Sequence, residues 1–385
     1  MNKEDLVHKL DTLKKRSGTH SPSISTIRRE IPDLEINIDA CFLSNPYATQ
    51  LFYKNIERDL LETNKLRDII EFYPGQNYDI AKLISQAIDC PAESIFVGNG
   101  AAEVIQAVLQ RFGGERILIN IPTFSAYYEF LLESQEVCYF RLKKEDDFKL
   151  NVEEYIKEIQ RLKPSTIVLI NPNNPDGGYL TKDALESILN ATKDIVETVI
   201  VDESFIHFAY ESDDLNPIQS THYLSTFSNL VIVKSMSKDF GIAGIRAGYA
   251  VMNNERVSEL TSNGFLWNIS GLAEYFFTLY TSEKFKNEYE VVRKKYIMNT
   301  MTFLQEIGQI DKLSVYPSKA NFALVEIKNG MTSWEFTREL LLRYGIYVRD
   351  CSDKIGLEGE FVRIASRTFE ENFKIVEALK TLLAE

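Results

Sequence analysis

The feature that most constrains the fold is an alternation of short β-rich runs with helical patterns between about residues 94 and 252. The runs are nearly continuous in Ile, Val and Leu, which predicts strands buried on both faces of a mostly parallel sheet. Helix-period stretches such as Glu103–Phe112 and Lys182–Ile195 separate them. This alternation indicates an α/β architecture with helices on both faces of the sheet. The predicted strands are Ile95–Gly98, Arg116–Ile121, Thr166–Asn171, Thr198–Asp202 and Leu230–Lys234.

The rest of the chain predicts an arm and a second domain. After about residue 275, a charged helical stretch (Lys284–Gly308) leads into shorter strands and helices, which is typical of a smaller α+β domain. We expect residues 1–44 to form an N-terminal arm that packs with this small domain. Residues 45–275 would form the large domain and residues 276–385 the small one. A chain of 385 residues is long enough for two cores.

Charge and composition exclude several functional classes. The net charge of −13 argues against a nucleic-acid partner, which requires a concentrated basic face. The four cysteines form no CxxC pair and only four histidines are scattered among them, so no metal site is predicted. The N-terminus lacks the apolar core of a signal peptide, and no apolar run approaches the ~20 residues of a membrane span. We therefore expect a cytoplasmic protein without a membrane partner.

Polar segments follow four of the predicted strands. In sheets of this kind, ligands bind beyond the carboxyl ends of the strands. The coincidence of polar residues at four such ends predicts one composite site. The segments are Asn99–Ala102, Asn171–Pro175, Asp202–Phe205 and Ser235–Lys238.

The segment around Lys238 carries the most distinctive chemistry. A lysine just past a buried strand is partly desolvated, which favours the neutral amine that attacks an aldehyde to form a Schiff base. Ser235, Ser237 and Arg246 could hold a phosphate, the arginine through a charge-assisted bidentate pair. Taken alone, the segment also fits an ordinary surface loop.

The other strand ends add complementary groups. Asp202 could pair with a protonated pyridine nitrogen, or it could be a helix N-cap. Small residues at Gly98–Glu103 would expose backbone N–H groups to an anion at a helix start. An asparagine within Asn171–Gly178 could bond a ring hydroxyl, and Tyr127 could stack on a flat ring or belong to the core. Together these groups match one cofactor, pyridoxal 5'-phosphate.

Eight motifs in order make the sequence resemble a fold-type-I pyridoxal-phosphate enzyme of the aminotransferase superfamily, from about Ser44 to the C-terminus. The branch it resembles most holds histidinol-phosphate aminotransferases and threonine-phosphate decarboxylases. The resemblance implies the aspartate-aminotransferase-like fold, with a large mostly parallel α/β/α domain and a smaller α+β domain. The motifs are NPY (45–47), FYPG (72–75), GNGAAEVI (98–105), PTFSAYY (122–128), NPNNPDG (171–177), VDESF (201–205), SMSKDFGIAGIRAGY (235–249) and FVRIASRT (361–368).

The resemblance also implies roles for individual residues. Lys238 would be the Schiff-base lysine, Asp202 the partner of the pyridine nitrogen, and Asn174 the partner of the ring hydroxyl. Tyr127 would stack on the ring, and Tyr73 of a second subunit would complete the phosphate cup, which implies a homodimer with shared sites. The cofactor phosphate would be held by Ser235, Ser237, Arg246 and the backbone amides of Ala101 and Ala102.

The same resemblance implies a small anionic substrate, a phosphorylated amino compound. Arg363 would bind its carboxylate or phosphate region, and Arg349 and Arg367 would influence which bond breaks. Alternation along a strand would put Arg363 and Arg367 on one face as a double anion clamp. Alternatively, Arg367 only caps the final helix. His20 and Asn45 are further candidate contacts to the substrate phosphate, although a solvated surface histidine also fits His20.

Three features favour a decarboxylase over an aminotransferase. The run from Gly345 to Ser352 with Gly356-Leu357 resembles the decarboxylase C-terminal domain, and Arg367 supplies a second arginine. Phe205 also stands where many aminotransferases have a tyrosine that contacts the ring hydroxyl. We expect decarboxylation of phosphoserine or phosphothreonine to an amino-alcohol phosphate. The alternatives are a histidinol-phosphate-type aminotransferase that uses glutamate and 2-oxoglutarate, and a non-catalytic cofactor-binding regulatory module.

Overall fold

A computed structural model describes residues 3–384. The chain forms two compact units. The large unit comprises Ser44–Asn174 and Gly178–Lys295, and the small unit comprises Met1–Leu43, Pro175–Gly177 and Tyr296–Glu385.

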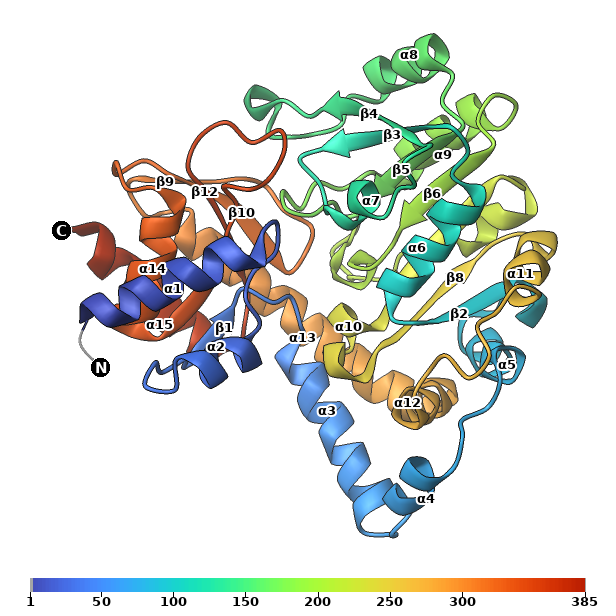
Figure 1. Ribbon diagram of the computed structural model, residues 1–385, viewed down its shortest axis with the longest axis horizontal. Coiled ribbons are helices and arrows are strands. Elements are labelled where there is room, and N and C mark those ends of the chain that lie inside the picture. Colours follow the sequence, from blue (N-terminus) through green and yellow to red (C-terminus); the bar gives the residue numbers. More distant parts are fainter. Residues whose placement is uncertain (1–2, 385) are drawn as a thin grey trace. The chain divides into compact units, whose positions relative to one another are not determined.

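The large unit is built on a seven-stranded sheet (Figure 1). Strands β2, β7, β6, β5, β3 and β4 run in one direction, and β8 alone runs antiparallel to its neighbours β2 and β7. The prediction of a mostly parallel α/β sheet is confirmed. In spatial order the strands are β2 (Ile95–Asn99), β8 (Ala247–Val251), β7 (Leu230–Ser235), β6 (Thr198–Asp202), β5 (Thr166–Ile170), β3 (Arg116–Ile121) and β4 (Glu136–Arg141).

Strand β8, which was not among the predicted strands, determines where Arg246 lies. Because β8 is antiparallel, it begins at the edge where the parallel strands end. Its first residues pair with the last residues of both neighbours, Ala247 with Asn99 and Gly248 with Ser235. Arg246 directly precedes β8 and is therefore brought to the carboxyl edge of the sheet.

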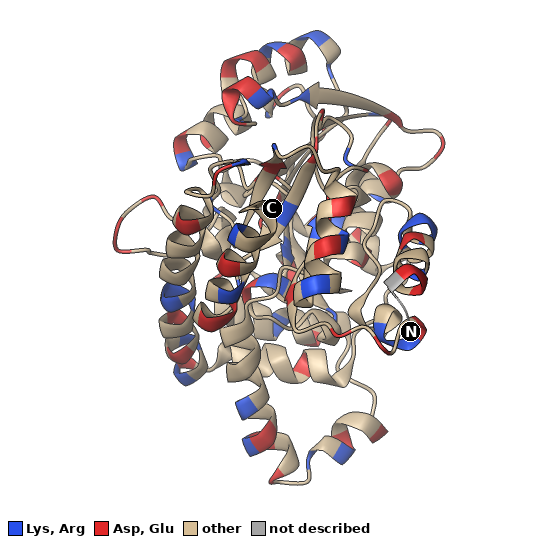
Figure 2. Ribbon diagram, turned by 90° about the vertical axis from the view of Figure 1, so that its left-hand side faces the viewer, with Lys and Arg blue, Asp and Glu red and all other residues tan. Residues whose placement is uncertain are grey.

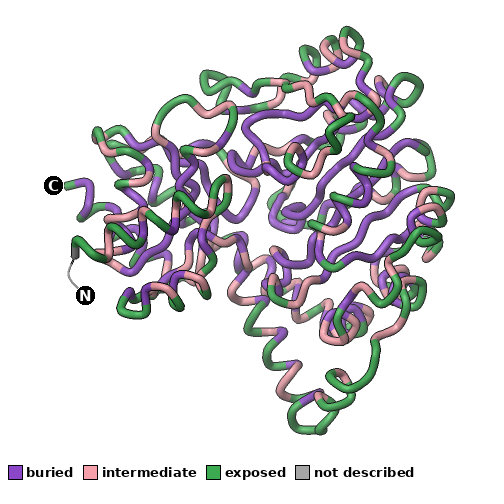
Figure 3. The backbone as a smooth tube through the Cα atoms, viewed as in Figure 1, coloured by how far each residue is buried: buried purple, intermediate pink, exposed green. Residues whose placement is uncertain are grey.

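Both faces of this sheet are covered. Alternate residues of one strand enter two different cores, as with Val199 and Val201 on one face and Ile200 on the other. Figure 3 shows the central strands as buried along their length. The helices of this unit are α3 (Pro46–Ile56), α4 (Leu66–Glu71), α5 (Asn77–Ile88), α6 (Ala101–Phe112), α7 (Ala126–Glu129), α8 (Val152–Leu162), α9 (Lys182–Thr192), α10 (Met236–Asp239), α11 (Asn254–Thr261) and α12 (Gly271–Thr281).

The large unit extends to Lys295, which is later than the expected boundary at residue 275. Aromatic residues of α12 and of the first turns of α13 (Glu283–Ile307) account for this difference, because they belong to the core of the large unit. The residues concerned are Phe276, Phe277, Tyr280, Phe285 and Tyr289.

The small unit has its own mixed sheet of five strands. In spatial order these are β1 (Ile38–Ala40), β11 (Ile346–Asp350), β12 (Phe361–Ala365), β10 (Phe322–Ile327) and β9 (Leu313–Val315). The N-terminal arm supplies α1 (Lys3–Ser17), α2 (Ile24–Glu30) and β1, which pairs in parallel with β11. Leu10, Leu13 and Ile27 of the arm pack with Tyr347. The other helices are α14 (Ser333–Tyr344) and α15 (Phe369–Ala384).

Acidic and basic residues are interspersed along the surface helices (Figure 2). On α8, for example, Lys157 pairs with Glu153 at 2.5 Å and Arg161 with Glu158 at 2.5 Å. Such exposed pairs add little to stability because water screens them. Within residues 3–384, no helix is both long and apolar enough to span a membrane.

Candidate active site

Lys238 lies in α10, a single helical turn that directly follows β7. Ser235 caps this turn, because its hydroxyl accepts a hydrogen bond from the backbone N–H of Ser237 at 3.3 Å. The carbonyl oxygen of Lys238 accepts the backbone N–H of Asn45 at 3.0 Å and that of Gly241 at 3.2 Å. Both serines are buried and Lys238 is half-buried. The lysine is therefore presented from a short turn that is held at several points.

Asp202 is a buried and well-oriented carboxylate at the end of β6. It accepts the Tyr127 hydroxyl at 2.8 Å and the backbone N–H of Ser204 at 2.8 Å. Burial raises the pKa of Asp202, while hydrogen bonds from Ser204 and Tyr127 and the charge of Lys234 oppose this rise. These contacts fix the orientation of a carboxylate that could pair with a cationic ring nitrogen.

Tyr127 takes a different part from the expected one. Its side chain is 0% exposed and its hydroxyl is bonded to Asp202, so it has no ring face to offer to a ligand. Burial and the neighbouring Asp202 raise the pKa of Tyr127 well above its usual value, which keeps the phenol a donor. Phe124, three residues earlier in the same loop after β3, is only half-buried. Tyr128 is half-buried too, but Phe124 is the one that lies in the loop directly after β3, and its place just beyond a strand end was the overlooked signal.

An anion cradle lies at the start of α6. Gly100, the N-cap of α6, has a φ of +76°, and a Cβ there would lie 2.3 Å from Nη2 of Arg246. Arg246 donates to the carbonyl oxygens of Ala243 at 3.1 Å and of Asn99 at 3.4 Å. The first N–H groups of a helix have no intrahelical partner, and the helix dipole favours an anion there. An arginine against a glycine cap and a helix start fits the phosphate of pyridoxal phosphate.

The loop after β5 contains three asparagines. Two of them hold the loop in place, and the third is a candidate to bind the cofactor. Asn171 exchanges hydrogen bonds with the backbone of Leu180 at 3.0 and 2.8 Å. Asn173 donates to the carbonyl oxygen of Pro122 at 3.0 Å and accepts the Thr123 hydroxyl at 3.0 Å. These two side chains tie down the part of the loop that directly precedes Asn174. Asn174 is buried and remains the asparagine of this loop that could bond a ring hydroxyl.

Behind Lys238 and Asp202 lies a buried polar cluster that the sequence did not predict. Lys234 forms an ion pair with Asp239 and donates to the carbonyl oxygen of Glu203 at 2.9 Å. Nδ1 of His207 lies 3.4 Å from Asp239 and 3.0 Å from the Tyr289 hydroxyl. The sequence feature that could have indicated this cluster is the position of two acidic residues directly after predicted site residues: Glu203 follows Asp202, and Asp239 follows Lys238.

Burial dominates the protonation states of this cluster. It raises the pKa of Glu203 to about 7, although the Ser220 hydrogen bond and Lys234 oppose the rise. It raises the pKa of Asp239 to about 6 against the attraction of Lys234. It lowers the pKa of His207 well below its usual value, helped by the charges of Lys234 and Arg293. The histidine is therefore neutral at pH 7.

Arg293 of α13 completes the cluster. The residue is fully buried. The guanidinium donates to the carbonyl oxygens of His207, at 2.8 Å, and of Leu215, and it pairs with Glu290 at 2.7 Å. This arginine is fully used by the fold, which indicates a structural role.

The small unit holds all three predicted substrate arginines, and two of them, Arg349 and Arg363, form a pair. They are direct cross-strand neighbours on β11 and β12, and both are buried. Arg363 donates to the carbonyl oxygen of Cys41 at 2.8 Å and lies over the ring of Phe322 at 5.3 Å. Arg349 donates to the carbonyl oxygen of Thr19 at 2.9 Å and pairs with Asp353 at 2.6 Å. Like charges directly opposite in a sheet repel, so this arrangement favours a bound anion.

Arg367 does not share a strand face with Arg363, contrary to expectation. Strand β12 ends at Ala365, so the alternation of side chains does not reach residue 367. The Arg367 side chain lies 3.5 Å from Glu371, at the start of α15. The structure therefore pairs Arg363 with Arg349, and places Arg367 at the helix end as in the alternative interpretation.

The remaining predicted residues differ in exposure. Asn45 is 0% exposed and caps α3, and its Nδ2 atom has no hydrogen-bond partner within residues 3–384. Phe205 is also buried, whereas His20 is exposed. Tyr73 is 82% exposed, and its ring centroid lies 5.2 Å from that of Trp267. Asn45 is thus placed next to Lys238, whereas the side chains of Tyr73 and His20 are exposed.

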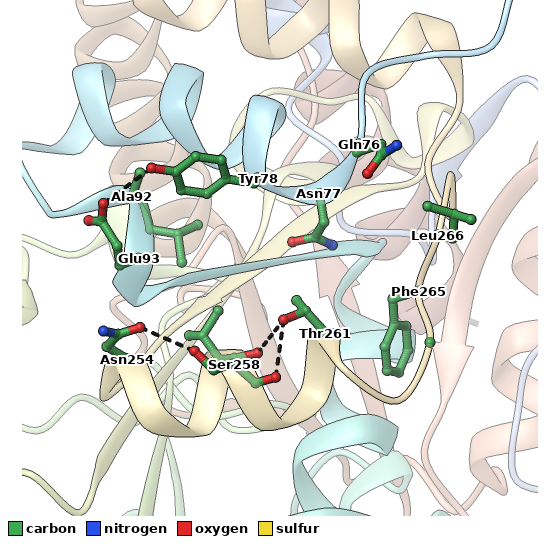
Figure 4. A pocket seen from close by; sticks show the side chains of 13 residues that line it. Gln76, Asn77, Tyr78, Ala92, Glu93, Asn254, Ser258, Thr261, Phe265 and Leu266 are labelled. Carbon is green, nitrogen blue, oxygen red and sulfur yellow. Dashed lines mark hydrogen bonds between the residues drawn. The ribbon is translucent and has the colours of Figure 1, made fainter.

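A cavity of about 290 Å³ lies elsewhere in the large unit (Figure 4). It is lined by residues of α5, α11 and the loop before Trp267. Within it, the Tyr78 hydroxyl donates to Glu93 at 3.2 Å and Ser258 bonds Asn254 at 3.4 Å, as the dashed lines show. None of the predicted cofactor residues lines this cavity, so it is distinct from the candidate active site.

Comparison with known proteins identifies the family. Residues 55–379 match the family "Aminotransferase class I and II". The chain belongs to this family. The resemblance inferred from the motifs is confirmed, and so is the prediction of pyridoxal 5'-phosphate as the cofactor, because this family depends on it.

Relatives of known name cover nearly the whole chain. The L-serine phosphate decarboxylase of Campylobacter jejuni subsp. jejuni is 50% identical over 382 residues, which cover 99% of this chain and 98% of that protein. A histidinol-phosphate aminotransferase of Methanococcus aeolicus is 32% identical over 343 residues, covering 88% of each chain. The solved structure of a decarboxylase from Sulfurospirillum multivorans superposes with a TM-score of 0.94 at 43% identity, covering 99% of this chain and 96% of that one. The predicted fold type is thereby confirmed.

Proposed function

We propose that this chain is a decarboxylase that converts O-phospho-L-serine and a proton into phosphoethanolamine and carbon dioxide. The observation that carries this proposal is the 50% identity, over 99% of the chain, to a protein named L-serine phosphate decarboxylase. The aminotransferase relative is only 32% identical over 88% of the chain. Phosphothreonine, which is one methyl group larger, is the second candidate substrate.

The large unit would hold the cofactor at the carboxyl edge of its sheet. Pyridoxal 5'-phosphate, when bound, accepts the electron pair that is left when a bond to the substrate's α-carbon breaks. Lys238 would attach to its aldehyde, Asp202 would pair with the ring nitrogen, and Asn174 would bond the ring hydroxyl. Phe124 replaces Tyr127 as the proposed stacking residue, because Tyr127 is fully buried whereas Phe124 is half-buried and lies just beyond the end of β3. The phosphate would be held by Ser235, Ser237, Arg246 and the backbone amides of Ala101 and Ala102.

The arginines of the small unit would decide which bond breaks. Arg349 and Arg363 carry the charge needed to bind the anionic groups of the substrate, and their mutual repulsion falls when an anion lies between them. These two arginines would orient the substrate so that the bond from its α-carbon to the carboxylate is the one that breaks. After carbon dioxide has left, a proton must reach the α-carbon. We assign this transfer to Nζ of Lys238.

Phe205 supports decarboxylation over transamination. Its buried side chain carries no hydroxyl, so it cannot supply the hydrogen bond that a tyrosine would give at this position. That loss removes a contact worth on the order of 1 kcal/mol from the aminotransferase arrangement.

The deciding experiment incubates the cofactor-loaded protein with phosphoserine and measures carbon dioxide and phosphoethanolamine. We expect both products in equal amounts, and none from the Lys238→Ala variant. A parallel reaction with phosphothreonine ranks the two substrates. Transfer of nitrogen between glutamate and a phosphorylated oxo compound, without release of carbon dioxide, would overturn the proposal in favour of an aminotransferase.

We also propose that two copies of the chain share their active sites. Tyr73 and Trp267 are respectively 82% and 45% exposed, and Phe72 beside them is 63% exposed. Exposed aromatic groups of this kind are usually covered by a partner. If Tyr73 completes the site of a second copy, mixing Lys238→Ala with Tyr73→Ala should restore about a quarter of the wild-type activity, because half of a statistical mixture is heterodimer with one intact site. No restoration in a mixture shown by sedimentation to contain dimers would refute shared sites.

A further inference from the structure

Lys354 is a buried lysine in a loop of the small unit whose other residues, apart from Cys351, are exposed or half-buried. The loop joins β11 to β12, and Lys354 is 8% exposed. Within residues 3–384, no hydrogen bond or ion pair of its ammonium group is found. Its Nζ atom is not among the fully buried side-chain atoms that lack a partner, so the aliphatic stem is buried while the ammonium group reaches water. The ammonium group is therefore accessible to a ligand that the chain does not itself supply.

The exposure of the neighbouring residue shows that hydrophobic packing of the loop does not explain the burial of Lys354. Ile355, directly after Lys354, is 42% exposed. A loop that folded only to remove apolar surface from water would bury the isoleucine and expose the lysine. Two turn hydrogen bonds instead hold the inverted arrangement, from the N–H of Lys354 to the oxygen of Cys351 at 3.0 Å and from the N–H of Leu357 to the oxygen of Lys354 at 3.2 Å.

The surroundings of Lys354 carry an excess of positive charge. The charged groups with the largest effect on it are Arg349, Arg363 and Asp353, so the two arginines and Lys354 itself make three cations against a single carboxylate. The thiols of Cys41 and Cys351 add no negative charge, since burial raises the pKa of both and that of Cys41 to about 11. A phosphate monoester carries a charge of about −1.5 to −2 at pH 7, which matches this excess.

We propose that Lys354 is a phosphate-binding residue, which together with Arg349 and Arg363 receives the phosphate ester of the substrate and selects phosphorylated over unphosphorylated amino acids. This inference rests on the proposed function for the identity of the substrate. It adds a residue that neither the motifs nor the strand patterns indicated.

The protonation of Lys354 supports this role and predicts a pH dependence. Burial, followed by the charge of Arg349, lowers the pKa of Lys354 to about 8, while Asp353 opposes the shift. The ammonium form, which binds an anion, is lost as the pH rises through that value. Affinity for phosphate should therefore fall above pH 8 in the wild type, and this component should be absent from a variant without the lysine.

The test compares Lys354→Gln and Lys354→Met with the wild type in the cofactor-loaded enzyme. We expect KM for phosphoserine to rise about 10- to 100-fold, as for loss of a charge-assisted hydrogen bond, with kcat changed only a few-fold. The increase in Tm that inorganic phosphate produces in the wild type should disappear. In phosphate-free buffer the Tm of both variants should equal or exceed that of the wild type, because an uncompensated charge has been removed.

Lys14→Gln is the matched control in the same unit. Lys14 pairs with the buried Asp350 at 2.7 Å, so its loss should lower Tm while leaving KM and the phosphate response unchanged. An unchanged KM and phosphate response in both Lys354 variants, or a lowered Tm alone, would overturn the inference. If the wild type releases no carbon dioxide from phosphoserine, the proposed function fails, and the Tm response to inorganic phosphate still decides the role of Lys354.

Discussion

Two clusters of buried charge, one in each unit, differ in how their cations are compensated. In the large unit, Lys234 pairs with Asp239, and Arg293 is used by two carbonyl oxygens and Glu290. In the small unit, Arg349, Lys354 and Arg363 face one carboxylate, Asp353. A buried charge that is fully bonded within the chain holds the fold together. An excess of buried charge of one sign indicates a binding site for a ligand of the opposite charge.

The largest effect is expected where the compensated cluster is broken. Arg293→Met leaves two carbonyl oxygens and Glu290 without their donor and should destabilise the protein by about 3–5 kcal/mol. Urea unfolding measures this loss. A change below 1 kcal/mol would show that this arginine does not organise the cluster.

The next effect depends on pH and concerns Glu203. The folded protein holds the Glu203 proton up to about pH 7, whereas the unfolded chain releases it near 4.5. Ionisation therefore removes stability as the pH rises between these values, by at most about 3 kcal/mol for a shift of this size. Glu203→Gln cannot ionise, so its stability relative to the wild type should increase from pH 5 to pH 8. Unfolding curves at both pH values check this, and an equal difference at the two would contradict it.

A smaller change in stability is expected in the uncompensated cluster. Arg363→Gln loses the bond to Cys41 but relieves the repulsion from Arg349, so the free energy of unfolding should change by less than about 1 kcal/mol. The same variant should raise KM for phosphoserine at least tenfold, as for loss of a charge-assisted bond. A loss of stability as large as that in Arg293→Met would contradict the proposal that Arg293 stabilises the fold and Arg363 does not.

The smallest effect is expected on the surface. Lys157→Ala removes the ion pair to Glu153 on α8, which lies in water. We expect no measurable shift of the urea midpoint, because solvent screens exposed pairs. A clear shift would mean that an exposed ion pair also stabilises the fold, and that burial is not what makes a charge structurally important.

Local patterns predicted the parts of the fold that depend on hydrophobic runs. Arg116–Ile121 and Thr198–Asp202 are strands with the predicted bounds, because nearly uninterrupted apolar residues define them. Strand β8 was missed because Ala-Gly-Tyr-Ala-Val contains small residues, and edge strand β4 because it is only partly buried. The domain boundary was placed before α13 because the packing of Phe285 and Tyr289 is a tertiary property.

The candidate site shows the same division. Residues at strand ends, such as Lys238 and Asp202, could be identified because sequence position alone brings them to one edge. Tyr127 was given a stacking role because its burial depends on neighbours from other elements. Lys354 could not be recognised at all, since a lysine in a charged loop ordinarily points into solvent.

The excess charge around Lys354 also links the lifetime of the protein to its supply of substrate. A ligand that binds only the folded state stabilises it, by about 2.7 kcal/mol when its concentration is a hundred times Kd. A cell that accumulates the phosphorylated amino acid would thus protect the enzyme from proteolysis, and one that runs short would leave it more easily degraded. In this way, Arg349, Lys354 and Arg363 would link the amount of enzyme in the cell to the concentration of its substrate.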